Sequence, residues 1–406
     1  MGSSPEKHIA VIDVGSAKTC VLVGEVSEGV LRYRAHASVE SKGTRKGAIV
    51  DLEKASGAIA KAAEEAEKQC GAPIGHAVVS VGGPLMRGIN SRGGLNLGSR
   101  PREITREDVR QAIDRARSVV LPADREMVHL LPQEFIVDQQ PGIRDPLGMT
   151  GMKLEVSVHM VTAGQSATQN VVTSANRAGI QVDDTVFEGL GAAECVLRPD
   201  ERELGVCLLD IGAGSTELSA FFEGWVAHTG VVPIGGDHFT NDVAVGLRTP
   251  LSEAEKIKRT FGHSVVTSVP EGNEIEVPAV GERPSRLMPQ RLLAEVLEPR
   301  ARELFEFVRE SLRQGGVLDA LGAGVVLTGG AARLPGLLSI AEAVLRRPAR
   351  LGVPMPLSRM PVSLAEPEHA VALGTLMYAH RSRVARAAPQ ETGFKAKLKA
   401  LFQSAG

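Results

Sequence analysis

Hydrophobic positions at the start of the chain follow the spacing of strands and then of a helix. Residues 8–39 are rich in β-branched and aliphatic side chains and predict three strands. Apolar or small residues then recur at three- and four-residue intervals over 51–69, which predicts a helix closed by Gly71. Another strand is predicted over 77–81. The chain therefore opens with a β unit, a helix and a returning strand, the beginning of an α/β fold.

The pattern changes after Pro84 and stays different until about Val161. A capping box over 105–108 precedes helically spaced apolar positions, and β-like runs occupy 128–138 and 153–161. One helix among several strands, bounded by Gly- and Pro-rich breaks, predicts an inserted α+β subdomain over 85–162. Further along the chain we expect helices over 165–177, 252–261, 290–313, 334–345 and 368–380, and strands over 180–187, 205–232 and 323–328.

Two segments nearly two hundred residues apart resemble each other. The motif from Asp13 to Thr19 and the motif from Asp210 to Thr216 both follow a β run and contain a Gly-bearing turn, and 210 − 13 = 197 residues separate them. Either motif alone is also typical of an ordinary hairpin. Its repetition favours two hairpins whose turn N–H groups bind phosphate. The candidate phosphate residues are Gly15, Ser16, Lys18, Gly212, Gly214, Ser215 and Thr216.

The two aspartates need a partner if they face a phosphate chain, because like charges repel. We therefore expect Asp13 and Asp210 to hold Mg²⁺, often through water. For Lys18, a solvated hairpin lysine is the alternative to phosphate contact. Glu188 and Glu194 are weak candidates for positioning an attacking water, and a surface carboxylate is the commoner role for each.

Two further motifs suit a nucleoside. Gly329, Gly330 and Ala331 follow a predicted strand, where glycines let the backbone approach a ring or a phosphate closely, although a plain turn is the alternative. Glu255 and Lys258 share one helix face at i and i+3 and could meet ribose and purine, or form a solvated ion pair.

Composition narrows the range of partners. The chain has 406 residues, 43% hydrophobic and 23% charged, with a net charge of −2, which describes a globular protein of several structural units. The weak net charge and the 3% aromatic content give no reason to expect nucleic acid. The four cysteines form no CxxC pair, and we expect them to be reduced, as in the cytosol.

The C-terminal residues 394–402 form an amphipathic pattern. At 100° per residue the large apolar side chains fall on one narrow face, and lysines flank it. This arrangement favours a helix lying in an anionic membrane surface, with packing on the protein's own body as the alternative. The residues of this predicted anchor are Phe394, Lys395, Lys397, Leu398, Lys399, Leu401 and Phe402, and 381–393 is the expected linker.

Together these motifs resemble the actin, Hsp70 and sugar-kinase superfamily: the two Asp-x-Gly turns, the motif at 327–330 and the small-residue helix at 370–374 match its nucleotide motifs. Within it, LPQEF at 131–135, ERELGVCLLDIGAGST at 201–216, AEVLEPR at 294–300 and GVVLTGGAARLPGL at 324–337 resemble the FtsA family of bacterial cell-division proteins. The expected fold is α/β and actin-like, with two lobes built on duplicated ribonuclease-H-like domains.

The resemblance implies ATP with Mg²⁺ between the lobes, self-assembly into filaments, and attachment to anionic lipid on the cytoplasmic face of the inner membrane at the division site. It implies binding of the FtsZ C-terminal tail, with Arg286 and Arg300 as candidate contacts, and recruitment of later division proteins by the insert. No convincing catalytic carboxylate is present, so ATP turnover is expected to be weak or absent. The alternatives are a small-molecule kinase and a pilus-assembly scaffold of the same superfamily.

The resemblance also implies a division of the chain. The expected parts are a first lobe (1–84, 163–204 and 366–380), the insert (85–162), a second lobe (205–236 and 316–365), an FtsZ-binding subdomain (237–315), the linker (381–393) and the membrane tail (394–406).

Overall fold

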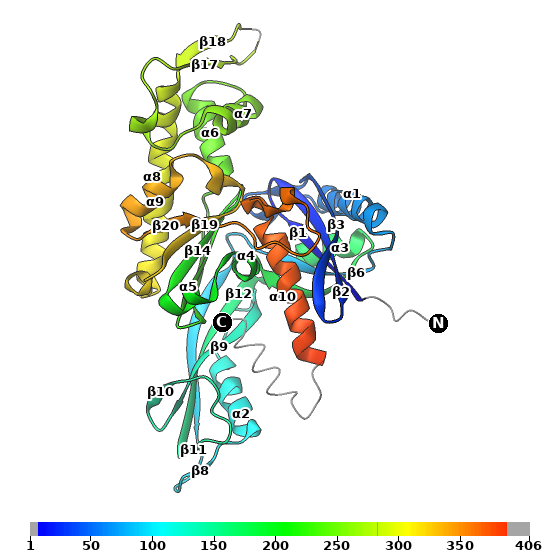
Figure 1. Ribbon diagram of the computed structural model, residues 1–406, viewed down its shortest axis with the longest axis vertical. Coiled ribbons are helices and arrows are strands. Elements are labelled where there is room, and N and C mark those ends of the chain that lie inside the picture. The colour runs from blue at the N-terminus through cyan, green and yellow to red at the C-terminus, as the bar shows by residue number, and fades with distance from the viewer. Residues whose placement is uncertain (1–6, 282, 388–406) are drawn as a thin grey trace.

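Two five-stranded sheets with equivalent strand order form the centre of the molecule. The computed structural model describes residues 7–281 and 283–387, and Figure 1 shows one sheet in blue on the right and the other in green and yellow on the left. In each sheet an antiparallel three-stranded unit is extended by two parallel strands. The first sheet has the order β13 (Gln181–Phe187), β6 (His76–Val81), β1 (Lys7–Val14), β2 (Lys18–Ser27), β3 (Val30–Glu40). The second has the order β20 (Ala349–Leu351), β19 (Gly324–Thr328), β14 (Val206–Ile211), β15 (Thr216–Phe222), β16 (Trp225–Val232).

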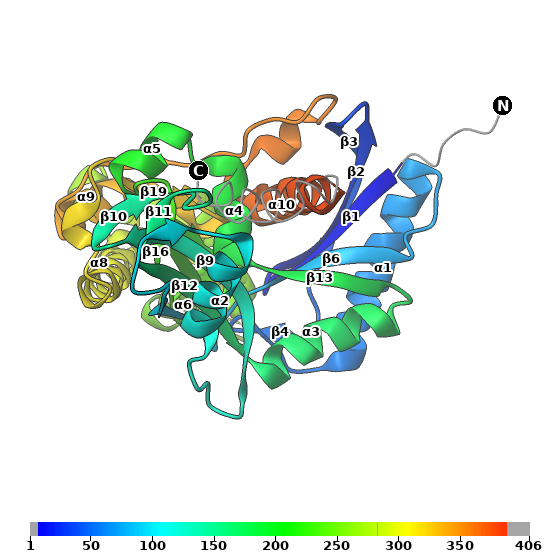
Figure 2. The same ribbon diagram turned by 90° about the horizontal axis from the view of Figure 1, so that it is seen from below.

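Helices cover both faces of the first sheet, because successive residues of a strand point to opposite sides. Ile9 and Val11 face α10 (Ala370–Ala387), whereas Ala10 and Ile12 face α1 (Leu52–Cys70), and all four are buried. Helix α3 (Gln165–Arg177) lies beside α1, as Figure 2 shows. The first sheet is therefore a buried layer between helices.

The insert forms a separate sheet at the bottom of Figure 1, covered by α2 (Arg106–Arg117). Its core contains Phe135, Leu154 and Val156, which are fully buried. The predicted capping box is present: the Thr105 hydroxyl accepts from the Asp108 N–H. The strands are β7 (Arg87–Asn96), β9 (Arg125–Val137), β10 (Gln140–Ile143) and β12 (Lys153–Gly164), with a short pair, β8 (Arg102–Glu103) and β11 (Thr150–Gly151).

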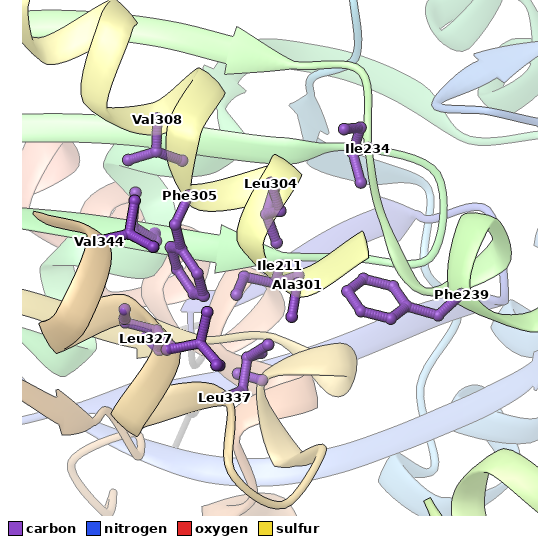
Figure 3. Packing of buried hydrophobic residues seen from close by; sticks show 14 of the residues in the cluster. Ile211, Ile234, Phe239, Ala301, Leu304, Phe305, Val308, Leu327, Leu337 and Val344 are labelled. Carbon is purple, nitrogen blue, oxygen red and sulfur yellow. The ribbon is translucent and has the colours of Figure 1, made fainter. Parts of the chain in front are cut away.

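A helical region stands at the top of Figure 1 and shares its core with the second sheet. Figure 3 shows Phe305 and Leu304 of α8 (Gln290–Gln314) packed near Ile211, the residue after Asp210. This core therefore supports the second predicted phosphate turn from behind. The elements of this region are α6 (Gly236–Gly246), α7 (Leu251–Phe261), β17 (Glu274–Val277), β18 (Arg286–Pro289) and α8, whereas α9 (Leu337–Leu345) packs on α8 and β20 beside the second sheet.

Two helices cross at the joint between the lobes. Helix α4 (Glu188–Val196) packs against α10, with Gly191 facing Gly374. Helix α10 continues to Ala387, so the part of the expected linker over 381–387 belongs to this helix. The small-residue motif used to predict this helix covers 370–374. Leu376 and Ala379, beyond that motif, also pack on the first sheet.

The predicted membrane residues 394–402 lie outside the described residues, as does the rest of the tail. Among residues 7–281 and 283–387 we find no helix with the length and apolarity required to span a membrane.

Candidate functional site

The two repeated motifs form hairpins with matching geometry. In the first, the Gly15 N–H donates to the Lys18 carbonyl at 3.0 Å; in the second, the Gly212 N–H donates to the Ser215 carbonyl at the same distance. Asp13 is the last residue but one of β1 and lies opposite Cys20, and Asp210 is the last residue but one of β14 and lies opposite Glu217. The offset of 197 residues thus holds for turn and register alike, which indicates a structural duplication.

The two turns lie against each other between the lobes. A Cβ on Gly214 would stand 2.6 Å from the Ser16 hydroxyl and 2.4 Å from the Gly47 nitrogen, so only glycine fits there. The Ser16 hydroxyl accepts from the Gly47 N–H at 2.8 Å. In the part of the chain that the structure describes, the N–H groups of Ala213 and Gly214 donate to no protein acceptor. The second turn therefore carries two neighbouring amides without a protein acceptor, which is a feature of anion sites.

The hydroxyl groups of the turns are occupied by protein partners. Ser215 donates to Glu217 at 2.8 Å, and Thr216 donates to the Ile234 carbonyl at 2.7 Å. The Ser16 hydroxyl is held by Gly47, as described above. In this arrangement the hydroxyls brace the turns, and the capacity to bind an anion lies with the backbone amides.

Three buried carboxylates, Asp13, Asp210 and Glu217, surround the turns together with the partly exposed Glu188. Burial raises the pKa of each, and their mutual repulsion raises the pKa of Glu188 and Asp210 further. The Ser80 hydroxyl donates to Asp13 at 2.8 Å and opposes this effect on its pKa. Such a cluster favours either protonation or a bound cation.

Lys18 is a cation that acts on this cluster, and it lowers the pKa of both Asp13 and Asp210. Its ammonium group lies 3.2 Å from His369 Nδ1 and 3.5 Å from Glu368, at the start of α10. The described residues contain no group of three or more His, Cys, Asp or Glu side chains placed to ligate a metal directly. A divalent cation would therefore be held partly through water, as Mg²⁺ commonly is.

The predicted nucleoside residues meet on the second lobe. Lys258 pairs with Glu255 at 2.6 Å and donates to the Gly236 carbonyl at 2.9 Å. A Cβ on Gly236 would lie 3.3 Å from the Ala331 side chain, so these segments are adjacent. Gly329 lies directly beside Asp210 and has a φ of 85°, a backbone conformation that residues other than glycine tolerate poorly. The structure thus joins the third and fourth motifs to the second turn.

Glu194 is separated from this cluster by its partners. Its carboxylate lies 2.7 Å from Arg381 and 3.8 Å from Arg202, and these ion pairs tie α4 to α10 and α5 (Pro199–Leu204). Glu188, at the other end of α4, lies in the carboxylate cluster. Of the two weak catalytic candidates, only Glu188 is placed beside the turns.

The two predicted partner arginines are engaged within the protein. Arg300 forms a bidentate pair with Asp242, at 2.6 and 3.0 Å, and also contacts Glu303. Arg286 donates to the Leu247 carbonyl. A peptide that used the Arg300 guanidinium would have to compete with Asp242.

Sequence reasoning missed three parts of the site. Glu217 follows the second motif directly, and its position opposite Asp210 in a predicted hairpin was the available signal. The Gly235-Gly236 pair, which lies beside Ala213 and Lys258, is the second missed part. Its signal was the pair itself, because two glycines after a strand allow other backbone segments to approach closely. Gly47 reaches the site from the β4 (Thr44–Arg45) to β5 (Ala48–Ile49) hairpin, for which the local sequence carries no phosphate signal.

Comparison with known proteins identifies the family. The sequence model "Cell division protein FtsA" matches residues 207–374, and the model "SHS2 domain inserted in FTSA" matches residues 83–162. Cell division protein FtsA of Pseudomonas aeruginosa is 41% identical over 92% of this chain and 89% of its own length. The chain belongs to the FtsA family of cell-division proteins. The Escherichia coli FtsA is 35% identical over 94% of this chain and 92% of its own, and the Bacillus subtilis FtsA 34% over 97% and 88%.

Solved structures confirm the predicted fold for this FtsA-family chain. The "PilM-PilN type IV pilus biogenesis complex" aligns with a TM-score of 0.64 at 18% identity, covering 92% of this chain and 98% of that one. MreB5 of Spiroplasma citri bound to ADP aligns with a TM-score of 0.57 at 13% identity, covering 93% and 98%. The fold is actin-like and two-lobed, with an inserted SHS2 domain.

Proposed function

We propose that this protein binds ATP with Mg²⁺ between its lobes, polymerises on the inner membrane, and tethers the FtsZ ring there while recruiting later division proteins. The observation that carries the nucleotide part is the meeting of two duplicated turns beside a cluster of four carboxylates, three of them buried. Open amides suit phosphate oxygens, and uncompensated carboxylates suit a hydrated divalent cation. MreB5 of Spiroplasma citri, which shares the fold, has structures bound to ADP and to AMPPNP, and this supports a nucleotide in the same fold.

The residues present fit such a ligand. Asp13 and Asp210 would hold Mg²⁺ through water, and the amides around Gly15 and Gly214 would hold the phosphates. The nucleoside would lie by Gly329, Gly330, Ala331, Glu255 and Lys258. Lys18 stands within reach of the two aspartates and would exchange Glu368 and His369 for a phosphate oxygen. ATP supplies charge and contacts to both lobes when bound, and it thereby favours one lobe arrangement over another.

Nucleotide binding is tested by titrating the full chain with a fluorescent ATP analogue in Mg²⁺. Asp210→Ala should weaken affinity by about tenfold or more, the usual range for loss of a group that orients a metal. Asp319→Ala is a matched control, because Asp319 lies on the second lobe in an exposed pair with Arg347. An unchanged affinity of the Asp210 variant would remove this residue from the site.

The tether function rests on the family and on the tail pattern. We propose that residues 394–402 insert their apolar face into an anionic membrane, while the subdomain over 237–315 binds the FtsZ tail. A chain ending at Gly393 should bind ATP like the full chain and should not sediment with anionic liposomes. Sedimentation that persists in this variant would contradict the anchor, whereas loss of ATP binding would show that the truncation damages the fold.

A further inference from the structure

The insert is part of the first lobe by sequence, yet a buried polar contact fastens it to the second. His159 on β12 is 1% exposed, and both of its ring nitrogens are bonded. Nδ1 lies 2.6 Å from Asn90 Oδ1 of the same sheet, and Nε2 lies 2.8 Å from Thr229 Oγ1. Thr229 belongs to β16, the edge strand of the second sheet, and is itself 2% exposed. The contact between the insert and the second lobe is therefore dry and specific.

Neighbouring contacts extend this junction along β16. The Asn90 amide donates to the Ala227 carbonyl at 3.1 Å, and the Gln133 amide donates to the Val226 carbonyl at 2.8 Å. A Cβ on Gly88 would lie 2.5 Å from Thr229 Oγ1 and 2.6 Å from the Thr229 carbonyl oxygen. Strands β7 and β16 therefore pack with their backbones close together at Gly88, and any atom added there would have to separate them.

The same inserted sheet also holds the first lobe. His129 on β9 accepts the Phe187 N–H at 2.9 Å, at the point where β13 passes into α4. His129 is buried as well. Phe187 immediately precedes Glu188, a member of the carboxylate cluster. One sheet thus contacts both the start of α4 and β16 of the opposite lobe.

We infer that the inserted subdomain is a clasp that holds the two lobes closed, through the His159–Thr229 junction on one side and the His129–Phe187 junction on the other. Opening the lobes would pull β16 away from β7, break these hydrogen bonds and expose the packed surface between the strands to water, which disfavours opening. The clasp itself does not depend on the nucleotide, but its link to ATP rests on the proposed function. If ATP favours closed lobes, a ligand that draws the insert off β16 must weaken ATP binding. ATP must then weaken the binding of that ligand by the same factor.

Lobe separation is measured directly with spin labels on the full chain. The four native cysteines are buried, so Lys61→Cys on α1 and Glu306→Cys on α8, both exposed, can be labelled selectively. Gly88→Ala adds a methyl group, the wedge, to the junction. Double electron–electron resonance should then give an interlobe distance distribution with a longer mean and a larger width. Gly75→Ala is the matched control, because its added methyl meets no atom within 4 Å. Distances that are unchanged by the wedge would overturn the inference.

A milder variant and a second measurement cover the case in which the wedge unfolds the insert. Thr229→Val keeps the volume and removes the bond to His159, and it should also broaden the interlobe distance. With Mg²⁺-ATP, both variants should bind at least about fivefold more weakly than the wild type, the lower end of typical coupling between sites. If the wild type binds no ATP, the proposed nucleotide function fails, and the distances alone then decide the clasp. If the wild type binds and the variants bind equally well with unchanged distances, the clasp is wrong.

Discussion

Glu217 Oε1 in the second lobe accepts a hydrogen bond from the Gly83 N–H in the first lobe, at a distance of 3.1 Å. The same carboxylate accepts from Ser215 at 2.8 Å, so it connects the second phosphate turn with the loop that leads into the insert. Because Glu217 is buried, its negative charge carries a desolvation cost, and burial raises its pKa. The position combines an interlobe contact with a charge for which the described residues provide no ion-pair partner.

Replacing this charge should stabilise the protein without ligand. Glu217→Gln keeps an oxygen for Gly83 and removes one of four crowded carboxylates, so its melting temperature should exceed that of the wild type in the absence of Mg²⁺. The raised pKa means that the folded carboxyl retains a proton which the unfolded chain releases, so the wild type loses stability as the pH rises above about 4. The gain should therefore be larger at pH 8 than at pH 5.

The matched variant Glu217→Leu separates charge from hydrogen bonding. It removes the charge as well but leaves the Gly83 N–H without an acceptor, which costs about 1–3 kcal/mol. Thermal melts of the three proteins at both pH values test the prediction. A Gln variant that melts below the wild type at pH 8 would contradict it.

The two buried histidines of the insert should make the fold sensitive to acid. Burial lowers the pKa of His129 to about 4 and that of His159 to about 3. Each stays neutral in the folded state while the unfolded chain takes up a proton below about 6.5. The contribution of these neutral histidines to the free energy of unfolding is therefore complete above pH 6.5. As the pH falls toward 4, the free energy of unfolding decreases by roughly 3 kcal/mol for each histidine.

Urea unfolding at pH 7.5 and 5.0 measures this loss. His159→Gln retains hydrogen-bonding capacity but does not titrate, so its stability should fall less between the two pH values than that of the wild type. Equal losses in both proteins would show that His159 does not contribute to the acid sensitivity.

Substitution at the crossing of α4 and α10 should be severely destabilising. A Cβ on Gly374 would lie 1.7 Å from the Gly191 carbonyl oxygen, so Gly374→Ala must push the helices apart, at a cost of about 1–3 kcal/mol or more. Gly57→Ala in α1 makes the same change in an open helical position, where it should stabilise by about 0.5–1 kcal/mol. Opposite signs in denaturant unfolding are expected, and a tolerated Gly374 variant would contradict the close packing.

Competition at Arg300 gives a test of the proposed FtsZ-tail site. Asp242→Asn removes the carboxylate that occupies the Arg300 guanidinium, so an acidic FtsZ tail peptide should bind a few-fold more tightly, in line with about 1 kcal/mol for an ion pair that is still partly open to solvent. Arg300→Ala should bind more weakly than either. Glu310→Gln, which frees Arg313 further along α8, is the control and should leave the peptide affinity unchanged. Equal affinity of all variants would place the peptide elsewhere.

Local pattern was sufficient for most elements of this molecule. The β-branched and aliphatic runs of β1 and β2, the spacing and C-terminal glycine of α1, and the capping box of α2 were readable because short-range forces decide them. The end of α10 was misplaced, since its packing partners on β1, β2 and β6 are distant in sequence. The Arg-, Gly- and Asn-rich strand β7 was not predicted, because its partners rather than its own side chains hold it in place.

The sequence by itself determined that two Asp-x-Gly turns exist 197 residues apart, because a duplicated hairpin leaves a duplicated local pattern. Only the tertiary structure decided that Glu188 and Glu217 join Asp13 and Asp210, that Glu194 is held by arginines instead, and that the insert is fastened to both lobes. Those outcomes depend on which side chains long-range packing brings together in a dry interior, where burial changes the charge state of a carboxyl or an imidazole. No local spacing encodes that environment.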